Sequence, residues 1–286
     1  MGENGSHPGV RAVEARRRTP GSWPILLLAT LFVIATFLAW YFTWFGREIS
    51  DADISTYLAD EKNPRHVQHA LVQIQQRMER QDPNARQWYP QLLALSESAE
   101  PEFRLTVAWL MGFDNHSSQF HDSLLRLLHD REPLVRRNAA LALVRFNDAS
   151  GREEIVAILQ PFSVRAPAGG VVDSSLAKGA TVARNTLLAR LVQSDGGMVQ
   201  VRSPLPGKIH QQTRESGTQV SEGDEILSLN SDENSIWEAL RGLALVGTKE
   251  DIPSLESYAN STDVSARIRD QANFTIKTIL YRTKPA

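Results

Sequence analysis

The stretch from Val164 to Leu229 decides the architecture of this chain, because it contains one short pattern twice. The first copy reads Val164-Arg165-Ala166-Pro167-Ala168-Gly169-Gly170-Val171, followed by Gly179, Val182 and Leu188. The second copy reads Val201-Arg202-Ser203-Pro204-Leu205-Pro206-Gly207-Lys208-Ile209, followed by Gly217, Val220 and Leu227. Gly tolerates positive φ and Pro presets φ at turn corners, so this spacing predicts short strands joined by tight turns. Each copy is too small to bury a core alone, and we expect the two to interlock.

The duplicated pattern resembles the biotinyl/lipoyl-type barrel, the flattened β-sandwich of biotin and lipoic acid carriers and of the periplasmic adaptor (membrane fusion) proteins of bacterial exporters. This resemblance implies an inserted all-β barrel-sandwich hybrid over residues 163–230. Carriers of that family hold their cofactor on a lysine at the hairpin that joins the two halves. Here that hairpin, residues 192–199, contains an Asp195-Gly196 turn and no lysine, and Lys208 lies in the next turn. The resemblance therefore implies the fold without a bound cofactor.

Exporter adaptors of the same family commonly insert a long helical hairpin between the two halves. This chain has only a few turn residues at that point. The departure weakens the interpretation as a standard export adaptor, which remains an alternative.

An apolar run lies near the N-terminus. Residues 25–45 carry no charge, and about 21 residues rising 1.5 Å each span roughly 30 Å, the thickness of a bilayer core. The sequence therefore predicts a transmembrane helix over residues 23–46. Trp23 at one end and Trp40, Tyr41 and Trp44 at the other are typical of interfacial aromatic belts.

The flanking charges predict how that helix is oriented. Residues 1–22 form a basic tail with four Arg against Glu3 and Glu14, so the N-terminus is expected in the cytoplasm. The bulk of the chain would then be periplasmic, on the inner (cell) membrane of a bacterium. The alternatives are a cleavable signal peptide and, from Arg16-Arg17-Arg18, a twin-arginine export signal.

From about residue 64 the apolar residues recur at helical spacing. Three segments, residues 100–110, 132–143 and 263–272, each open with an acidic or Pro-bearing turn, place an Arg soon after and continue with small residues. These segments resemble the second helices of HEAT-type repeats, and they predict an α-solenoid. The segments 119–129, 153–160 and 252–258 are expected to be the first helices of the same repeats.

The predicted strands interrupt one of these repeats. The apolar segment 155–159 leads into the strands, and a helix that fits as its partner appears only at 235–245. We therefore expect the β-rich segment to be inserted between two helices that pack against each other, since closing a loop costs little when its ends lie close together.

Several groups of polar residues are candidates for chemical sites. His66 and His69 share a helical face without a carboxylate at suitable spacing, and surface histidines are the favoured interpretation. His116, His121 and His129, with Asp122 and Asp130 nearby, are not expected to converge. The sequence contains no Gly-x-Ser-x-Gly elbow, phosphate loop or dinucleotide fingerprint. We therefore predict no catalytic, metal-binding or cofactor-binding residue, no cofactor and no enzymatic activity.

Tryptophans and arginines receive structural roles. Trp88 is assigned provisionally to membrane or interface contact, whereas Trp109 and Trp237, set among Ala and Leu at helical spacing, are expected in the core. Four arginines are expected in inter-repeat ion pairs or on solvated faces, although a solenoid also offers a long concave surface to a partner. These are Arg136, Arg137, Arg267 and Arg269.

Composition limits the class of partner. The net charge of −2 gives no bulk attraction to nucleic acid, and the absence of cysteine excludes disulfides and Cys-ligated zinc. The predicted fold class is multidomain α + β. Its segments are a cytoplasmic tail at 1–22, the transmembrane helix at 23–46, HEAT-like repeats at 47–162, the β-barrel at 163–230 and further repeats at 231–286.

The function expected from these features is that of a membrane-anchored, extracytoplasmic scaffold or accessory subunit. It would contact the membrane through its anchor and the other subunits of a membrane protein complex through its repeats. The alternatives are a periplasmic adaptor of an export system and a cofactor-carrier subunit, for which biotin or lipoate on Lys208 would be the mark.

Overall fold

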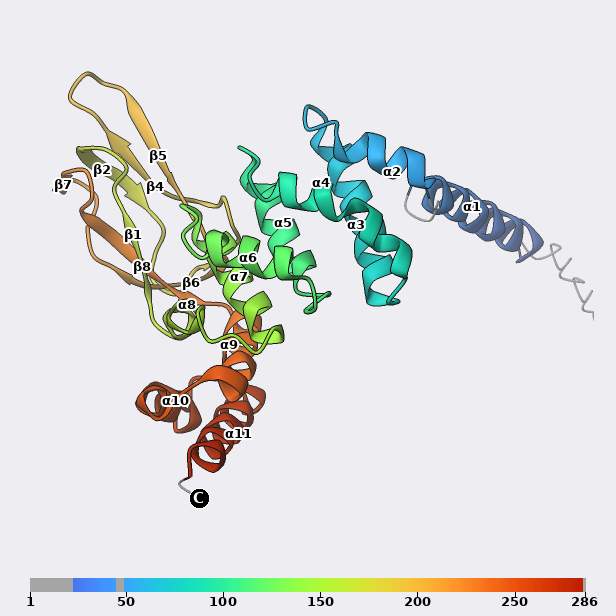
Figure 1. The fold of residues 1–286 in the computed structure, drawn as a ribbon. Helices are drawn as coiled ribbons and strands as arrows, with labels where there is room; N and C mark the ends of the chain where they lie inside the picture. Colours follow the sequence, from blue (N-terminus) through green and yellow to red (C-terminus); the bar gives the residue numbers. More distant parts are fainter. Residues whose placement is uncertain (1–22, 45–48, 285–286) are drawn as a thin grey trace, which may run out of the picture. The chain divides into compact units, whose positions relative to one another are not determined.

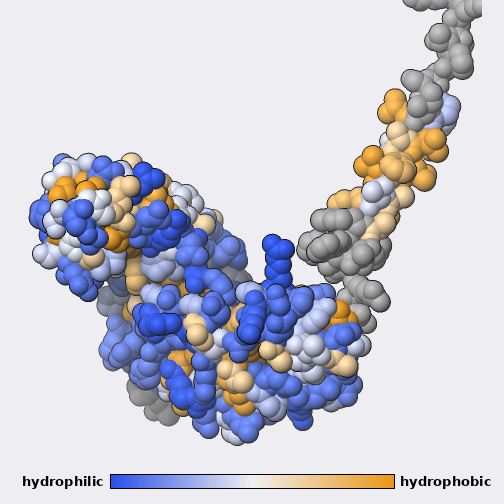
Figure 2. Space-filling view, turned by 90° about the horizontal axis from the view of Figure 1, so that it is seen from above, coloured by the Kyte–Doolittle hydropathy of each residue, from blue (hydrophilic) through white to orange (hydrophobic). Residues whose placement is uncertain are grey.

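The computed structural model describes residues 23–44 and 49–284, which belong to two compact units, 1–49 and 50–286 (Figure 1). In the first unit the described segment is helix α1, Trp23–Trp44. Its described apolar side chains, such as Leu28 and Phe32, are exposed. Figure 2 shows many apolar residues along this helix. The basic tail predicted at 1–22 lies outside the described residues.

The transmembrane helix predicted over 23–46 is corrected by the structure. A helical span takes about 20 consecutive, mostly apolar residues. Within residues 23–44 and 49–284, no helix is both long and apolar enough to cross a membrane. In α1, residues 26–39 are the longest uninterrupted stretch whose side chains the structure describes. The predicted belt positions of Trp40, Tyr41 and Trp44 concern side chains outside the described set.

The second unit contains pairs of helices stacked one after another, as the HEAT-like pattern predicts. The second helices α3, α5, α7, α9 and α11 form one continuous layer, because each packs against the next. The first helices of the pairs are α2 (Asp51–Leu58), α4 (Tyr89–Leu95), α6 (Ser118–Leu127), α8 (Arg152–Ile158) and α10 (Ile252–Ala259). The second helices are α3 (Pro64–Glu79), α5 (Pro101–Met111), α7 (Pro133–Arg145), α9 (Glu233–Val246) and α11 (Ala266–Arg282). Short 3-10 turns, η1 (Pro83–Trp88) and η2 (Lys249–Asp251), precede α4 and α10.

Local sequence sets where these helices begin. Proline occupies the first position of α3, α5 and α7, where its missing N–H costs no hydrogen bond. Ser117 and Ser265 cap α6 and α11, and their hydroxyls accept hydrogen bonds from the backbone N–H of Phe120 and Ile268. The acidic or Pro-bearing turns read from the sequence are therefore the starts of helices.

The β-rich segment forms two four-stranded antiparallel sheets. One sheet has the order β1-β8-β6-β3 and the other β5-β4-β2-β7. The strands of the first half are β1 (Phe162–Arg165), β2 (Gly170–Ser175), β3 (Thr181–Val182) and β4 (Leu187–Val192). Those of the second half are β5 (Met198–Arg202), β6 (Gly207–Gln212), β7 (Gln219–Val220) and β8 (Glu225–Ser231).

The barrel expected over residues 163–230 is corrected by this topology. Closing a barrel requires strand pairing that runs around the whole circumference. Among the described strands, β1 and β3 end one sheet, β5 and β7 end the other, and no pairing joins the two sheets. Two of these edge strands are only two residues long, so they offer few backbone groups that could pair with the other sheet.

The duplication read from the sequence appears as a symmetry of the strand order. Replacing β1 to β4 by β5 to β8, and the reverse, converts the order of one sheet into that of the other. Each sheet contains two strands from each half, so the prediction that the halves interlock is confirmed. Gly179 and Gly217 occupy equivalent turns, and both have φ of +86°, a conformation that favours glycine.

The helices on either side of the strands pack against each other. Ile155 of α8 and Leu240 and Leu243 of α9 are fully buried in one apolar core. At the base of the strands the Ser231 hydroxyl donates a hydrogen bond of 2.8 Å to the carbonyl of Ile158. The expected contact between the flanking helices is therefore present, and the strands interrupt the chain without interrupting the stack (Figure 1).

The start of β2 provides a sharp test of this sheet packing. A Cβ added at Gly170 would lie 2.8 Å from the carbonyl oxygen of Val192 and 3.3 Å from Cβ of Leu191. We expect Gly170→Ala to lower the free energy of unfolding by about 1–3 kcal/mol, because strand β4 must shift to make room. Urea unfolding followed by circular dichroism measures this loss.

The neighbouring glycine is the matched control. A Cβ at the exposed Gly169 would meet only the Val220 carbonyl oxygen, at an ordinary 3.6 Å. Gly169→Ala is expected to leave the free energy of unfolding within about 0.5 kcal/mol of the parent. Equal losses in the two variants would contradict the close approach at Gly170.

Candidate functional site

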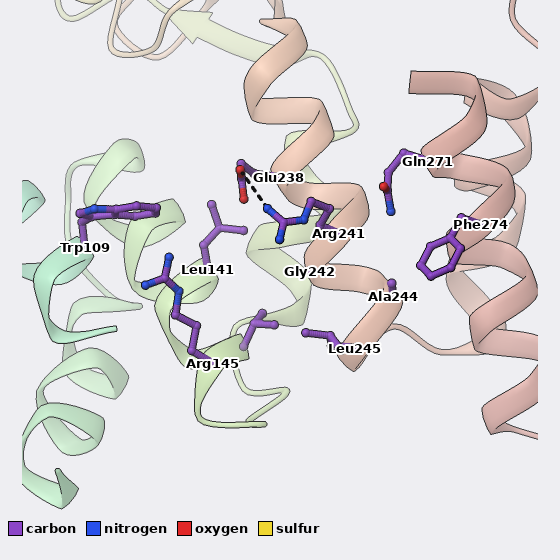
Figure 3. A pocket seen from close by; sticks show the side chains of 11 residues that line it. Trp109, Leu141, Arg145, Glu238, Arg241, Gly242, Ala244, Leu245, Gln271 and Phe274 are labelled. Atoms are coloured by element: carbon purple, nitrogen blue, oxygen red, sulfur yellow. Dashed lines mark ion pairs between the residues drawn. The ribbon is translucent and has the colours of Figure 1, made fainter. Parts of the chain in front are cut away.

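A groove crosses four successive second helices of the repeats, α5, α7, α9 and α11 (Figure 3). Its cavity volume is about 320 Å³, and both apolar and charged side chains line it. The lining residues are Trp109, Leu141, Val144, Arg145, Glu238, Arg241, Gly242, Ala244, Leu245, Gln271 and Phe274.

Small residues let these helices lie close together beneath the groove. A Cβ at Gly242 of α9 would sit 3.5 Å from side-chain carbons of both Val144 and Ile155. A Cβ at Gly112, just after α5, would lie 3.1 Å from Cβ of Ala142. Because the backbones approach closely at these points, longer side chains on the same helices form the walls of the groove.

Arg145 is the cation on the α7 wall. Its guanidinium lies 4.8 Å from the ring centroids of both Trp109 and Phe113, and Figure 3 shows it extending toward Trp109. Burial of part of the side chain lowers the pKa of Arg145, and the nearby charge of Glu238 partly opposes that effect. Two aromatic rings thus hold a cation at the solvent-accessible wall.

A second arginine cluster borders the groove on α9 and α11. The guanidinium of Arg241 lies 4.5 Å from the ring centroid of Trp237, and that of Arg267 lies 4.1 Å from the same ring. Arg241 also forms an ion pair with Glu238, with 3.6 Å between nitrogen and oxygen. Three helices of the array therefore contribute cations to one side of the molecule.

Three tryptophan predictions have different outcomes. Trp109 and Trp237 are only partly buried, so the expected core role is incomplete: each also presents a ring face to an arginine. Trp88, assigned provisionally to an interface, is 0% exposed, and its indole N–H donates to the Ser55 hydroxyl at 3.1 Å. The assignment of Trp88 was wrong because η1 folds against α2, a contact that helical spacing does not reveal.

Two of the four predicted structural arginines link α7 to its neighbours. Arg136 forms an ion pair of 2.7 Å with Glu154 at the next repeat. Arg137 is buried, burial lowers its pKa to about 10, and its guanidinium donates a long hydrogen bond of 3.4 Å to the Ser231 hydroxyl. Arg136 confirms the expected inter-repeat ion pair, whereas Arg137 connects the helices to the end of the β-rich segment.

The other two lie at the last repeat. Arg269 donates a hydrogen bond to the backbone carbonyl of Val264, at the turn before α11. Arg267 is exposed and stacks on Trp237. Only Arg267 therefore belongs to the surface around the groove.

Two ion pairs that the sequence did not single out, one buried and one partly buried, join successive repeats. Arg104 of α5 donates two hydrogen bonds, of 2.6 and 3.0 Å, to the carboxylate of Asp130 in the turn before α7. Arg152 of α8 makes the equivalent bidentate contact, of 2.7 and 2.8 Å, with Asp251 before α10. The recurring Arg after an acidic turn was the available signal, but only the stacked helices show which turn each Arg reaches.

The histidines take part in local contacts. His66 lies 2.9 Å from the Asp60 carboxylate and stacks on Tyr57, with ring centroids 4.4 Å apart. Nε2 of His121 lies 2.6 Å from the carboxylate of Asp148. Over residues 23–44 and 49–284, no group of three or more His, Cys, Asp or Glu side chains could hold a metal ion.

Lys208 lies at the start of β6, where it pairs with Thr181 and Asn230 of the neighbouring strands. The hairpin between β4 and β5, where carriers of the resembled family hold their lysine, has its Asp195-Gly196 turn as expected, with Gly196 at φ of +83°. Lys208 is therefore on a different strand from that hairpin.

Comparison with known proteins supports the helical part of the fold. The family described as HEAT repeats matches residues 89–169, from the start of α4 through β1 to the residue before β2. This match supports HEAT-like helical repeats in that part of the chain. The comparison with curated proteins gave no match.

One solved structure resembles a part of the chain. It is described as a single-chain, multi-domain long-chain acyl-CoA carboxylase, and the match covers 34% of this chain and 10% of that chain. The sequence identity is 16% and the TM-score is 0.24, so this likeness supports no conclusion about fold or function.

The Arg104–Asp130 pair gives a test of how the repeats are joined. Both side chains are almost fully buried, at 7% and 8% exposure. Asp130→Ala leaves Arg104 buried without its partner and is expected to cost about 3–5 kcal/mol of unfolding free energy. Glu97→Ala removes an exposed contact of 3.8 Å with Arg126, and it is expected to cost no more than about 1 kcal/mol. Urea unfolding of both variants measures the difference.

The same pair predicts a dependence on pH. Burial alone would raise the pKa of Asp130, but hydrogen bonds from Arg104 and from the Glu132 N–H outweigh it, and the pKa is lowered. The carboxylate therefore stabilises the fold above its ordinary pKa of about 3.9, and this contribution is lost as the pH falls through the lowered value. The gap in unfolding free energy between the parent and Asp130→Ala should narrow below about pH 4. A gap that stays constant down to pH 2 would contradict a charged pair.

Proposed function

We propose that the protein is a scaffold or accessory subunit that makes protein–protein contacts through the groove on its HEAT-like array. The observation that carries this proposal is the groove itself, which four successive helices line with both exposed apolar and cationic side chains. Leu245 and Phe274 are 59% and 58% exposed on its walls. Apolar side chains grouped in a hollow next to arginines are typical of surfaces that bind a partner.

The causes of the pKa shifts among the charged groups favour a binding role over a catalytic one. The carboxyls of Asp130 and Asp148 and the guanidinium of Arg152 have shifted pKa values, and each takes part in a contact between repeat helices or their turns. Burial would raise the pKa of both carboxyls, but hydrogen bonds from Arg104 to Asp130 and from Ser150 to Asp148 lower it, and the hydrogen bond to Asp251 raises the pKa of Arg152. We therefore propose no enzymatic role.

The β-rich segment is, in this proposal, a two-sheet relative of the biotinyl/lipoyl-type modules that does not carry a cofactor. Support comes from the duplicated motifs, from the symmetric order of the two sheets and from the hairpin of β4 and β5, which lacks a lysine. Its first and last strands join α8 and α9, so one end of the segment is attached to the array. The mass of the intact chain is expected to equal that of its sequence, and biotin or lipoate on Lys208 would overturn this part.

The proposed function is tested by affinity capture of the full chain from its native cells, followed by mass spectrometry of the retained proteins. We expect Leu245→Glu with Phe274→Glu to reduce the retained partner by at least about ten-fold, because both charges would enter the apolar walls of the groove. Both positions are exposed, so folding should be preserved, and circular dichroism verifies it.

The matched control replaces an exposed apolar residue elsewhere. Met198 on β5 is 66% exposed, and Met198→Glu is expected to leave partner capture unchanged. Loss of the partner with Met198→Glu alone would place the contact on the β-rich segment. A parent chain that retains no protein under conditions that preserve complexes would contradict the scaffold role.

A further inference from the structure

We propose that the groove binds a partner segment in which carboxylate side chains are flanked by apolar ones, and that Arg145 is the residue that receives the carboxylate. This inference rests on the proposed function, since it names the chemistry of the partner at the same groove. It commits to an acidic, apolar peptide segment of another protein as the occupant.

Arg145 has the properties of a preformed carboxylate receptor. Its guanidinium lies 4.8 Å from each of two ring centroids, so the rings of Trp109 and Phe113 limit how it can turn. Among the described residues Arg145 forms no ion pair, and the nearby Glu238 is paired with Arg241. A planar guanidinium can donate two parallel hydrogen bonds to one carboxylate. Arg145 is thus a held cation with N–H groups free to bind.

The charges around Arg145 also favour a negatively charged ligand. Arg241 of α9 lines the groove together with Arg145. Arg267 of α11 lies against Trp237 of α9. The acidic residue in the lining is Glu238, which Arg241 partly neutralises at 3.6 Å. A local excess of cations in a chain whose net charge is −2 indicates attraction to a negatively charged segment.

The apolar part of the groove distinguishes a peptide from a nucleic acid. Leu141, Val144, Leu245 and Phe274 share the lining with the arginines, and they span α7, α9 and α11 (Figure 3). Nucleic-acid binding depends on many phosphate contacts along a basic surface, whereas this groove alternates apolar side chains with a few cations. A peptide that bears both Asp or Glu and Leu-like side chains matches both features.

The test uses the full chain and a defined probe. The probe is a fluorescein-labelled peptide of about 12 residues in which Asp-Leu pairs are separated by Ser. The comparison peptide replaces each Asp by Asn and keeps the same shape and apolar content. Fluorescence anisotropy should show binding of the Asp-Leu peptide at least about ten-fold tighter than that of the Asn-Leu peptide, and the difference should shrink as salt is added.

Two arginine variants identify the receptor. Arg145→Gln is expected to weaken binding of the Asp-Leu peptide by at least about ten-fold, because it removes the held cation. Arg126→Gln alters an exposed arginine on α6, a first helix that does not line the groove, and should change binding by less than about two-fold. Thermal melting by circular dichroism verifies that Arg145→Gln is folded. If it is not, Leu245→Glu, at an exposed position, provides the same test by placing a repelling charge in the groove.

Each result bears on one of the two proposals. Equal binding of the Asp-Leu and Asn-Leu peptides, or unchanged binding by Arg145→Gln and Leu245→Glu, would overturn the carboxylate inference. Tighter binding of a single-stranded oligonucleotide than of the Asp-Leu peptide would also overturn it. If native partners were still captured by Arg145→Gln as by the parent, the scaffold role would stand and only this inference would fail.

Discussion

The contact between α8 and α9 is the interaction on which the rest of the structure depends. Ile155 on α8 and Leu240 and Leu243 on α9 are fully buried in the same core, although residues 159–232, which contain all eight strands, separate the two helices in the chain. Because these side chains are fully buried in one apolar core, the helices before and after the strands stack as neighbours. The groove needs that continuity, since α7 lies before the strands in sequence and α9 lies after them.

Ion pairs between repeats favour one register of helix stacking. Arg104 with Asp130, Arg136 with Glu154 and Arg152 with Asp251 each join one repeat to the next. The desolvation of a buried ion pair offsets much of its attraction, so such pairs add less to net stability than their short distances suggest. An unpaired arginine in the same place would be costly, however, and a shifted stack would leave several unpaired. These pairs therefore favour one register of the helices over its alternatives.

At the groove, aromatic rings contact the arginine guanidinium groups. The rings of Trp109 and Phe113 hold the guanidinium of Arg145, and the ring of Trp237 holds those of Arg241 and Arg267. Arg241 also pairs with Glu238, whereas the aromatic contacts of Arg145 leave its charge in place. A carboxylate in the same positions would fix the arginines equally well but would cancel their charge toward a ligand. The array thus uses acidic partners between its repeats and aromatic partners on its surface (Figure 3). This contrast separates the residues that build the fold from those that are free to bind.

The sequence by itself determined the local elements: the duplicated Pro and Gly pattern predicted two interlocking strand sets, and the helical spacing predicted HEAT-like repeats with the strands between two helices. Periodicity and turn residues act over a few positions, which is why these predictions succeeded. The same local signals misassigned Trp88 and predicted a transmembrane helix, and the resemblance to biotinyl/lipoyl-type modules implied a barrel; the described residues support none of the three. Only the tertiary structure decided which edges stay open, which turn each arginine reaches and that Trp109, Arg145, Arg241 and Phe274 meet in one groove. Those relations depend on how helices distant in sequence stack, and stacking depends on packing across the whole array, which no short pattern encodes.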